Sequence, residues 1–330
     1  MSGGKIFVLG AGAWGTALAA SFVRASLDVT LWAKESKLIE PLSSGDGNPL
    51  YLPGIDLPAI PTVNDYAGLA SSDVILAVVP AQYTRGIFKE IVSLIHQEAT
   101  LVLCAKGIEQ GSLKTMAEVA REEIPQAKLA VLSGPSFAKD VAMGLPTAVT
   151  LAVEEQETGE HLQSLLGHKN FRPYLSLDVK GAEIGGAVKN VLAIACGIVD
   201  GLELGRSAHA AMISRGFAEM TRLGVAMGGR AETLAGLCGL GDLVLTCSSP
   251  QSRNMSFGSA LGRGRDAATV LASRSSVTEG AATAPALLEL AKRYDVDMPI
   301  CEAVADILSG EADIQQAMTT LLSRPYKEEF

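Results

Sequence analysis

A glycine-rich segment near the amino terminus constrains the fold more than any other part of the chain. An apolar run at residues 6–9 leads into Gly10-Ala-Gly12-Ala-Trp-Gly15, and residues 16–23 then read as helix. Strand, glycine turn and helix in this order form a dinucleotide-binding fingerprint. In it Gly10 permits the tight turn, Gly12 admits a pyrophosphate and Gly15 lets the helix pack against the strand. The start of the helix then offers N–H groups and a positive dipole end to phosphates.

Two other interpretations of this segment are weaker. A secretory signal needs an unbroken apolar helix, and three glycines within six residues would interrupt it. A glycine-rich loop without a ligand is the other alternative, but the strand before it and the helix after it disfavour that interpretation. We therefore predict that the first part of the chain binds a dinucleotide.

Strand and helix patterns alternate over the first half of the chain. Apolar runs predict further strands at residues 29–32, 73–79, 100–104, 129–132, 147–153 and 171–177. Residues 41–61 are rich in proline and glycine, which predicts an irregular excursion rather than a helix. The alternation is typical of a doubly wound (Rossmann-like), mostly parallel sheet in an α/β protein.

Strand signals vanish near residue 180, and the remaining sequence predicts helices joined by glycine-rich turns. We expect a dinucleotide-binding domain at residues 1–179. An all-α domain that carries substrate and catalytic residues is expected at 180–330.

The residues after the second predicted strand bear on which dinucleotide binds. In folds that prefer NAD, an acidic residue usually lies there and binds the ribose 2′-hydroxyl. Here Trp32 is followed by Ala, Lys34 and Glu35, so a lysine stands at or beside the discriminating position. Lys34 favours a 2′-phosphate, hence NADPH or NADP, unless it is simply a solvated loop residue. Glu35 leaves NADH or NAD open.

Charge and composition argue against several classes of protein. With 27 Lys and Arg against 36 Asp and Glu, the net charge is −9, which disfavours a nucleic-acid surface. Apolar runs such as residues 190–200 are too short to cross a bilayer. Five cysteines without CxxC spacing indicate reduced thiols in a cytoplasmic protein. The four histidines show no metal-ligand spacing, so no metal site is expected.

Candidate polar residues follow two predicted strands at their carboxyl ends, where ligands bind in such sheets. Lys106 follows residues 100–104, and the turn from Ser133 through Gly134 to Ser136 follows residues 129–132. We expect Lys106 to reach a phosphate or a carbonyl held there. The alternative is a surface lysine in a turn.

Lys189 stands out within an apolar helix predicted over residues 181–200. On a 3.6-residue period it shares a face of small residues with Gly185 and Gly186. A lysine on such a face can point into a cleft, where desolvation lowers its pKa toward neutrality. Snorkelling out of the helix is the alternative. Asp242, a lone acid in an apolar, glycine-rich segment, needs a partner, and Lys189 is the obvious candidate.

Two further polar sets lie in the second half of the chain. Gln251-Ser252-Arg253-Asn254 combines a guanidinium group with two amides and suits a phosphate. Arg215, Glu219 and Arg222 are spaced i, i+4 and i+7 on a predicted helix, and we expect them to form structural ion pairs.

Most of these residues lie in seven ordered blocks in which the chain resembles the bacterial NAD(P)-dependent glycerol-3-phosphate dehydrogenases over essentially its whole length. The blocks are GAGAWGTALA (10–19), AKGIE (105–109), LSGPSFAKD (132–140), GGAVKNVLAIACGIVDGL (185–202), SRGFAEMTRLG (214–224), GLGDLVLTC (239–247) and QSRN (251–254). Ala13, Trp14 and Ser136 depart from the Ser, Tyr and Thr that are common in the family, without removing chemistry.

The resemblance implies a role for each matching position. Lys189 would be the general acid/base, with Asp242 orienting it. The residues implied to hold the substrate are Lys106, Gly134, Ser136, Lys189, Asp242, Ser252, Arg253 and Asn254. Those at cofactor-binding positions are Gly10, Gly12, Ala13, Trp14, Gly15, Lys34, Lys106, Ala138, Arg253, Val277 and Glu279.

The implied reaction is hydride transfer between NAD(P)H and C2 of dihydroxyacetone phosphate. It gives sn-glycerol 3-phosphate, a precursor for phospholipid synthesis. A related two-domain reductase of hydroxy acids or ketoacids is one alternative, which the Arg253-Asn254 set disfavours. A non-catalytic NADPH sensor is another, which leaves Lys189 and Asp242 unexplained. A homodimer is an expectation of the resemblance alone.

Overall fold

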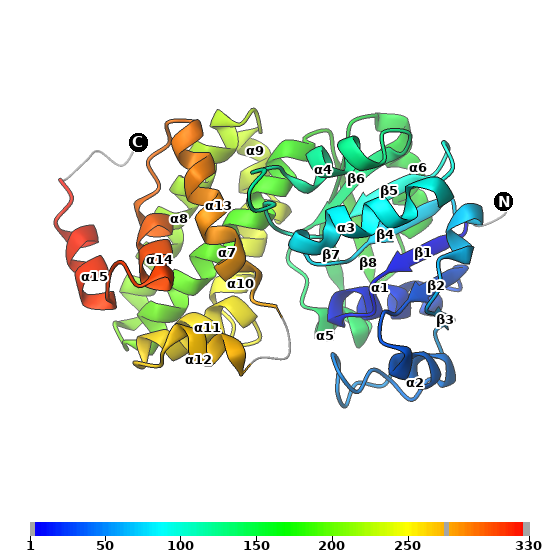
Figure 1. Cartoon of the computed structure of the whole chain (residues 1–330), viewed down its shortest axis with the longest axis horizontal. Helices are drawn as coiled ribbons and strands as arrows, with labels where there is room; N and C mark the ends of the chain where they lie inside the picture. Colours follow the sequence, from blue (N-terminus) through cyan, green and yellow to red (C-terminus); the bar gives the residue numbers. More distant parts are fainter. Residues whose placement is uncertain (1–3, 274–276, 326–330) are drawn as a thin grey trace.

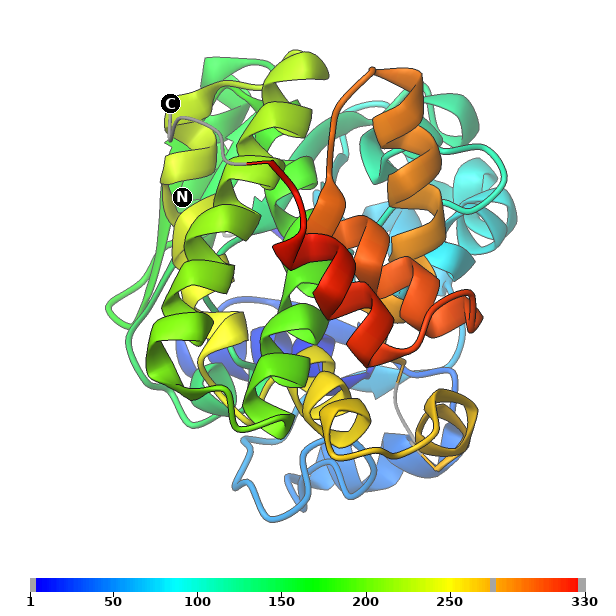
Figure 2. The ribbon, with the colours of Figure 1, turned by 90° about the vertical axis from the view of Figure 1, so that its left-hand side faces the viewer.

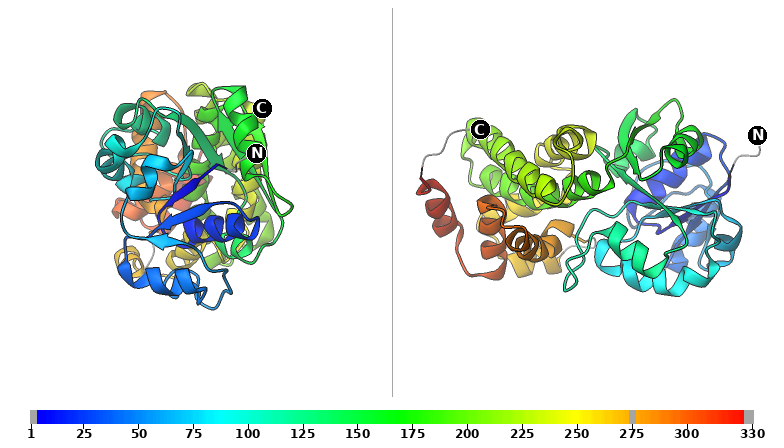
Figure 3. Two further views of the ribbon diagram at one scale, coloured as in Figure 1. Left: turned by 90° about the vertical axis from the view of Figure 1, so that its right-hand side faces the viewer. Right: turned by 90° about the horizontal axis from the view of Figure 1, so that it is seen from above.

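The protein consists of an α/β part and a helical part that lie side by side along its longest axis (Figure 1). The computed structural model describes residues 4–273 and 277–325. The α/β part contains the amino-terminal strands, and the last described helix lies at the opposite end of the molecule. The same two lobes are visible from above in the right panel of Figure 3.

An eight-stranded sheet forms the centre of the α/β part. Its order is β3-β2-β1-β4-β5-β6-β7-β8. All neighbouring strands are parallel except β6 and β7, which are antiparallel. The bounds are β1 Ile6–Leu9, β2 Val29–Trp32, β3 Thr62–Val63, β4 Val74–Ala77, β5 Thr100–Leu103, β6 Lys128–Ser133, β7 Thr147–Val153 and β8 Phe171–Ser176. The predicted doubly wound, mostly parallel sheet is confirmed, and its strand order reverses between β1 and β4.

Successive residues of β1 belong to different apolar cores on the two faces of the sheet. Ile6 and Val8 pack with one set of helices, and Phe7 and Leu9 pack with the other. The first set is α1 (Ala13–Arg24), α2 (Ile39–Ser44), α5 (Ala138–Ala142) and α6 (Gln156–Leu166). The second set is α3 (Ala81–Ile91) and α4 (Met116–Glu123). Burial on both faces explains why the strands read as continuous apolar runs.

Two features of the first half differ from the predictions. Residues 41–61 were expected to contain no helix, yet α2 runs from Ile39 to Ser44. Pro41 lies in its first turn, where the missing N–H removes no intrahelical hydrogen bond. Strand β3 was not predicted, since a strand of two residues carries too little pattern to recognise.

The helical part is built around α7 (Val179–Gly201), which packs against several of the helices that follow it. These helices are α8 Gly205–Ala226, α9 Ala231–Ala235, α10 Asp242–Cys247, α11 Arg253–Gly262, α12 Ala267–Ala272, α13 Glu279–Arg293, α14 Pro299–Ser309 and α15 Ile314–Leu322. A π-helical turn, η4 (Leu237–Gly241), leads directly into α10. Figure 2 views this part end-on, with α15 in front.

Helix α7 shows why apolar length alone does not identify a membrane span. Among the described residues it is the one helix that is long and apolar enough to cross a bilayer, with a mean hydropathy of 1.5. The predicted run of residues 190–200 is therefore part of a longer apolar element. The most apolar stretch of this helix is wholly buried inside the protein, as expected for a core helix.

The ion pairs predicted on α8 are wrong. Glu219 is buried, and its carboxylate accepts hydrogen bonds from the backbone N–H groups of Ile300 (2.8 Å) and Cys301 (3.2 Å). Arg222 instead donates to the carbonyl oxygen of Asp297 at 2.8 Å. The acid therefore lies at the start of α14, where the helix dipole favours it. Burial nevertheless raises the pKa of Glu219 to about 7.

Candidate active site

The turn between β1 and α1 has the geometry that the glycine pattern predicts. Gly10 has a φ of +116°. A Cβ at Gly15 would lie 1.9 Å from the carbonyl oxygen of Gly10, so the strand and helix can approach only without a side chain there. Around Gly12 a Cβ would meet no protein atom within 4 Å. No side chain caps the first N–H groups of α1, which leaves them available to an anion.

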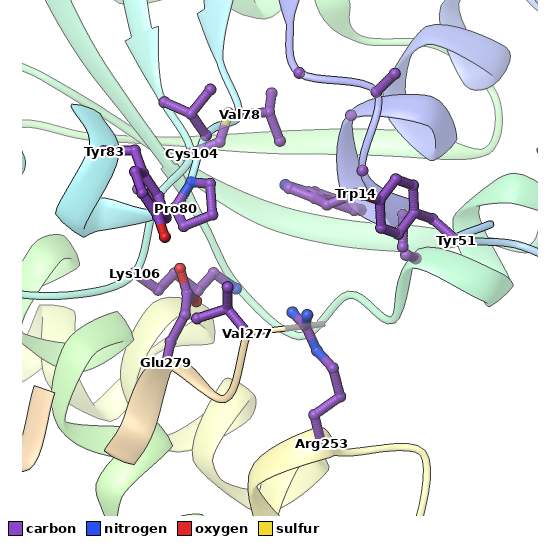
Figure 4. A pocket seen from close by; sticks show the side chains of 18 of the residues that line it. Trp14, Tyr51, Val78, Pro80, Tyr83, Cys104, Lys106, Arg253, Val277 and Glu279 are labelled. Carbon is purple, nitrogen blue, oxygen red and sulfur yellow. The ribbon is translucent and has the colours of Figure 1, made fainter. Parts of the chain in front are cut away.

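These N–H groups border a cavity of about 920 Å³ at the carboxyl ends of β1 and β4, where the strand order reverses. This is the position and size expected of a ligand site in such a sheet. Figure 4 shows that side chains of both parts of the protein enter it. The sequence-predicted residues that line it are Gly10, Gly12, Ala13, Trp14, Gly15, Lys34, Lys106, Ser136, Ala138, Lys189, Ser252, Arg253, Asn254, Val277 and Glu279. Gly134 and Asp242 lie behind its wall, in contact with Lys106.

Asp242 joins the two parts of the protein at the base of the cavity. Its Oδ1 atom accepts a hydrogen bond from Lys189 Nζ at 2.8 Å, and its Oδ2 atom accepts one from Lys106 Nζ at 2.7 Å. Lys189 Nζ also donates to Thr246 Oγ1 at 2.8 Å, and Lys106 Nζ donates to the Gly134 carbonyl at 3.1 Å. The predicted pairing of Lys189 with Asp242 is present, and Lys106 adds a second cation that sequence spacing did not reveal.

Burial sets the charge behaviour of this cluster. Desolvation lowers the pKa of Lys189 to about 8, although the nearby Asp242 carboxylate opposes the shift. Burial also disfavours the ionised form of Asp242, but Lys106 and Lys189 outweigh it and hold the pKa of Asp242 below its usual range. The cluster is therefore a carboxylate between two lysines, one of which titrates near neutrality. A group with such a pKa can both give and take a proton under physiological conditions.

Gly186 lets helix α7 pack closely against the end of the sheet. A Cβ there would lie 3.0 Å from Ser133 Oγ, at the end of β6, and 3.3 Å from Lys106 Cγ. One turn later the helix presents Lys189 to the cavity. On the face of small residues predicted from the sequence, Gly186 thus meets the end of the sheet and Lys106, and Gly185 meets η4, where a Cβ would lie 2.8 Å from the Cys238 carbonyl oxygen.

The predicted phosphate-binding segment lies at the start of α11. Ser252 is the N-cap of this helix, and its Oγ accepts a hydrogen bond from Met255 N at 3.1 Å. Arg253 points from α11 into the cavity (Figure 4). Across the cavity Ser136 Oγ donates to the Gly134 carbonyl at 3.0 Å. A helix N-terminus together with a guanidinium group favours an anion at this end.

Two residues of the site were missed by sequence reasoning. Thr246 lies one helical turn after Asp242, and its hydroxyl contacts both Asp242 and Lys189. Asn190 links the carbonyl of Lys106 (3.1 Å) to the side chain of Asn254 (2.9 Å). The i+4 spacing from Asp242 was a usable signal for Thr246. Asn190 carried none beyond its place next to Lys189.

Glu279 lies at the start of α13, and Figure 4 shows it near Lys106 in the cavity. Burial raises the pKa of its carboxyl group, while Arg253, Lys106 and Lys189 act in the opposite direction. It lines the cavity together with Glu35 and Glu90, alongside several lysines and Arg253.

Comparison with known proteins agrees with this geometry. Residues 5–159 match the family described as NAD-dependent glycerol-3-phosphate dehydrogenase N-terminus, and residues 178–319 match the corresponding C-terminus. The glycerol-3-phosphate dehydrogenases [NAD(P)+] of Maricaulis maris and Caulobacter vibrioides are 57% and 56% identical to this chain. Those matches cover 98% of it and 97% and 98% of the relatives.

A solved structure shows the same similarity in three dimensions. The crystal structure of glycerol-3-phosphate dehydrogenase from Coxiella burnetii superposes with a TM-score of 0.92 at 40% identity. It covers 97% of this chain and 99% of that one. The two family matches together span both parts of the protein and include the Lys106, Lys189 and Asp242 cluster. The chain therefore belongs to the NAD-dependent glycerol-3-phosphate dehydrogenase family.

Proposed function

We propose that this chain catalyses the NAD(P)H-dependent reduction of dihydroxyacetone phosphate to sn-glycerol 3-phosphate, and the reverse reaction. The observation that carries the proposal is the buried Lys189, whose Nζ lies 2.8 Å from Asp242 at the wall of the dinucleotide-sized cavity. Family membership supplies the substrate. A sensor without catalysis would have no use for this costly buried charge.

A dinucleotide fits the residues present. The N–H groups of α1 and the open space at Gly12 suit a pyrophosphate, and the nicotinamide would supply or accept the hydride. We assign the dinucleotide mainly to residues 1–179 and the substrate mainly to 180–330. The cofactor contacts are assigned to Gly10, Gly12, Ala13, Trp14, Gly15, Lys34, Lys106, Ala138, Arg253, Val277 and Glu279.

Lys189 handles the proton. In the reducing direction its Nζ gives a proton to the oxygen on C2 as hydride arrives at that carbon, so that a hydroxyl group forms. In the reverse direction neutral Nζ takes the hydroxyl proton. Asp242 keeps the amine oriented through the 2.8 Å hydrogen bond, and Lys106 adds positive charge near the developing oxyanion.

The phosphate of the substrate would lie at the start of α11. Ser252, Arg253 and Asn254 supply the N-terminal end of a helix and a guanidinium group there. Lys106 and the turn from Gly134 to Ser136 would hold the rest of the substrate. This places the phosphate away from the reacting carbon next to Lys189.

Four finer assignments complete the proposal. A preference for NADPH over NADH rests on Lys34, which lines the cavity. Supply of glycerol 3-phosphate to phospholipid synthesis, a cytoplasmic location and a homodimeric state rest on the resemblance to the family.

The reaction is tested by following oxidation of NADPH, and separately of NADH, by purified protein with dihydroxyacetone phosphate. Turnover with this substrate is expected with both cofactors, and faster with NADPH. Turnover confined to ketoacids without a phosphate would support the related-reductase alternative instead. Tight NADPH binding without turnover of any substrate would support the sensor.

The pKa of Lys189 predicts opposite pH profiles for the two directions. Because reduction needs the protonated amine, kcat/KM for reduction should be level below about pH 8 and fall about tenfold per pH unit above it. For oxidation kcat/KM should rise up to that pH and then level. The measurement is the initial rate in each direction at a series of pH values. One substrate is varied while the other is held at a saturating concentration, which gives kcat/KM for the varied substrate. Profiles for the two directions that bend the same way would contradict the assignment.

Arg253→Ala is predicted to weaken recognition of the substrate phosphate. Loss of a charge-assisted hydrogen bond should raise KM for dihydroxyacetone phosphate about 10- to 100-fold. Reduction of dihydroxyacetone, which lacks the phosphate, should lose only what the cofactor contact assigned to Arg253 contributes, and so change by a smaller factor. Arg263→Ala is the matched control, since this exposed arginine follows the far end of α11. Equal losses with both substrates would contradict a phosphate-specific role.

A further inference from the structure

The proline- and glycine-rich segment at residues 41–61 has no role in the mechanism above. Three of its residues nevertheless line the cavity, namely Leu50, Tyr51 and Leu52. We propose that this segment sets the choice between NADP and NAD, because Tyr51 holds the Glu35 carboxylate and leaves Lys34 to meet the ribose 2′ substituent. The inference rests on the dinucleotide site of the proposed function.

Asn48 fixes the segment to the glycine turn. It is buried, and its Nδ2 donates to the carbonyl of Ala11 at 3.0 Å and to Thr16 Oγ1 at 2.9 Å. Its Oδ1 accepts a hydrogen bond from the backbone N–H of Tyr51 at 3.0 Å. One amide side chain therefore sets where Tyr51 lies relative to the predicted phosphate-binding turn. Figure 4 shows Tyr51 on the same side of the cavity as Trp14.

Tyr51 in turn engages the acid that follows β2. Its hydroxyl donates to Glu35 Oε1 at 2.9 Å, and both side chains are half-buried. Burial, together with the hydrogen bond to Glu35 and the charge on it, raises the pKa of Tyr51. The phenol accordingly stays protonated and acts as the donor.

The hydrogen bond changes what a dinucleotide would meet at this position. An unengaged acid after β2 would accept a hydrogen bond from the 2′-hydroxyl of NAD and repel the 2′-phosphate of NADP. Here the Glu35 carboxylate already accepts a hydrogen bond from Tyr51. Lys34, by contrast, is exposed and lines the cavity, and no carboxylate of the described residues forms an ion pair with it. Lys34 is thus the charge available to a 2′-phosphate.

Binding measurements test the inference without turnover. Calorimetric Kd values for NADP⁺ and NAD⁺ are compared for the unmodified protein, Tyr51→Phe, Glu35→Gln and the double variant. Tyr51→Phe should shift the ratio of the two Kd values about tenfold toward NAD⁺, the size expected for release of one charged hydrogen-bonding group. Adding Tyr51→Phe to Glu35→Gln should change the ratio by less than about twofold, because no acid remains to be released.

The controls separate this inference from the proposed function. Tyr174→Phe removes a hydroxyl from an exposed tyrosine of β8, outside the cavity, and should leave the ratio unchanged. An unchanged ratio in Tyr51→Phe, or the same shift in both Glu35 backgrounds, would overturn the inference while the proposed reaction stands. Failure of the unmodified protein to bind either dinucleotide would overturn both.

Discussion

Replacing Lys189 by alanine is expected to abolish reduction of dihydroxyacetone phosphate while leaving NADPH binding intact. Lys189 is the buried amine whose pKa, about 8, suits proton transfer near neutrality. Loss of a general acid typically costs about 10²- to 10⁴-fold in rate. The fold should survive, because Asp242 keeps its ion pair with Lys106 at 2.7 Å when Lys189 is removed.

The measurement is kcat together with the Kd for NADPH, obtained from quenching of tryptophan fluorescence, since Trp14 lines the cavity. Lys180→Ala is the matched control. Lys180 lies in the first turn of the same helix, and its partner is Glu118 at 2.7 Å, outside the cavity. A Lys189→Ala enzyme that keeps its rate within a few-fold of the unmodified protein would remove Lys189 from the mechanism.

Asp242→Asn is expected to damage both stability and catalysis. The substitution keeps the shape of the side chain but leaves Lys106 and Lys189 as neighbouring cations without their shared carboxylate. Breaking a buried ion pair by removing one partner costs about 3–5 kcal/mol of unfolding free energy. The pKa of Lys189 should fall further, because Asp242 raises it more than Glu279, the other acid that acts in this direction.

Two readouts distinguish the roles of Asp242. Denaturant unfolding should show the loss of stability, and the bend in the pH profile for reduction should move to lower pH. Asp28→Asn serves as the control, since Asp28 is exposed and its side chain makes no hydrogen bond within the described residues. A variant with unchanged stability and an unchanged pH profile would show that Asp242 neither holds nor tunes Lys189.

The sequence predicted the sheet well because buried parallel strands are continuous apolar runs. The glycine pattern at residues 10–15 likewise predicted the strand–turn–helix geometry, since each glycine has a local steric reason. Short elements with weak local sequence patterns were not predicted. The two residues of β3 and the short α2, with Pro41 inside it, could not be distinguished from loop.

Within the site, single chemically distinctive residues were easier to predict than their partners. Lys189 and Asp242 stand out as isolated charges in apolar segments. Lys106 contacts Asp242 across 136 positions of the chain, and spacing says nothing about a contact of that range. Glu219 shows the converse, because its helical spacing suggested arginine partners while packing gave it the backbone of α14.

The antiparallel step between β6 and β7 has a consequence for where the chain can place a catalytic group. β7 and β8 run against the first six strands, and through β7 and β6 the last residue of β8, Ser176, lies in register with Leu103, the carboxyl end of β5. Helix α7 therefore starts close to the end of the sheet that borders the cavity and reverses the direction of β8. From Val179 to Lys189 it climbs about 15 Å, and each added or deleted residue would turn the lysine by about 100°. The number of helical residues before Lys189 therefore fixes both the position and the direction of its amine in the active site.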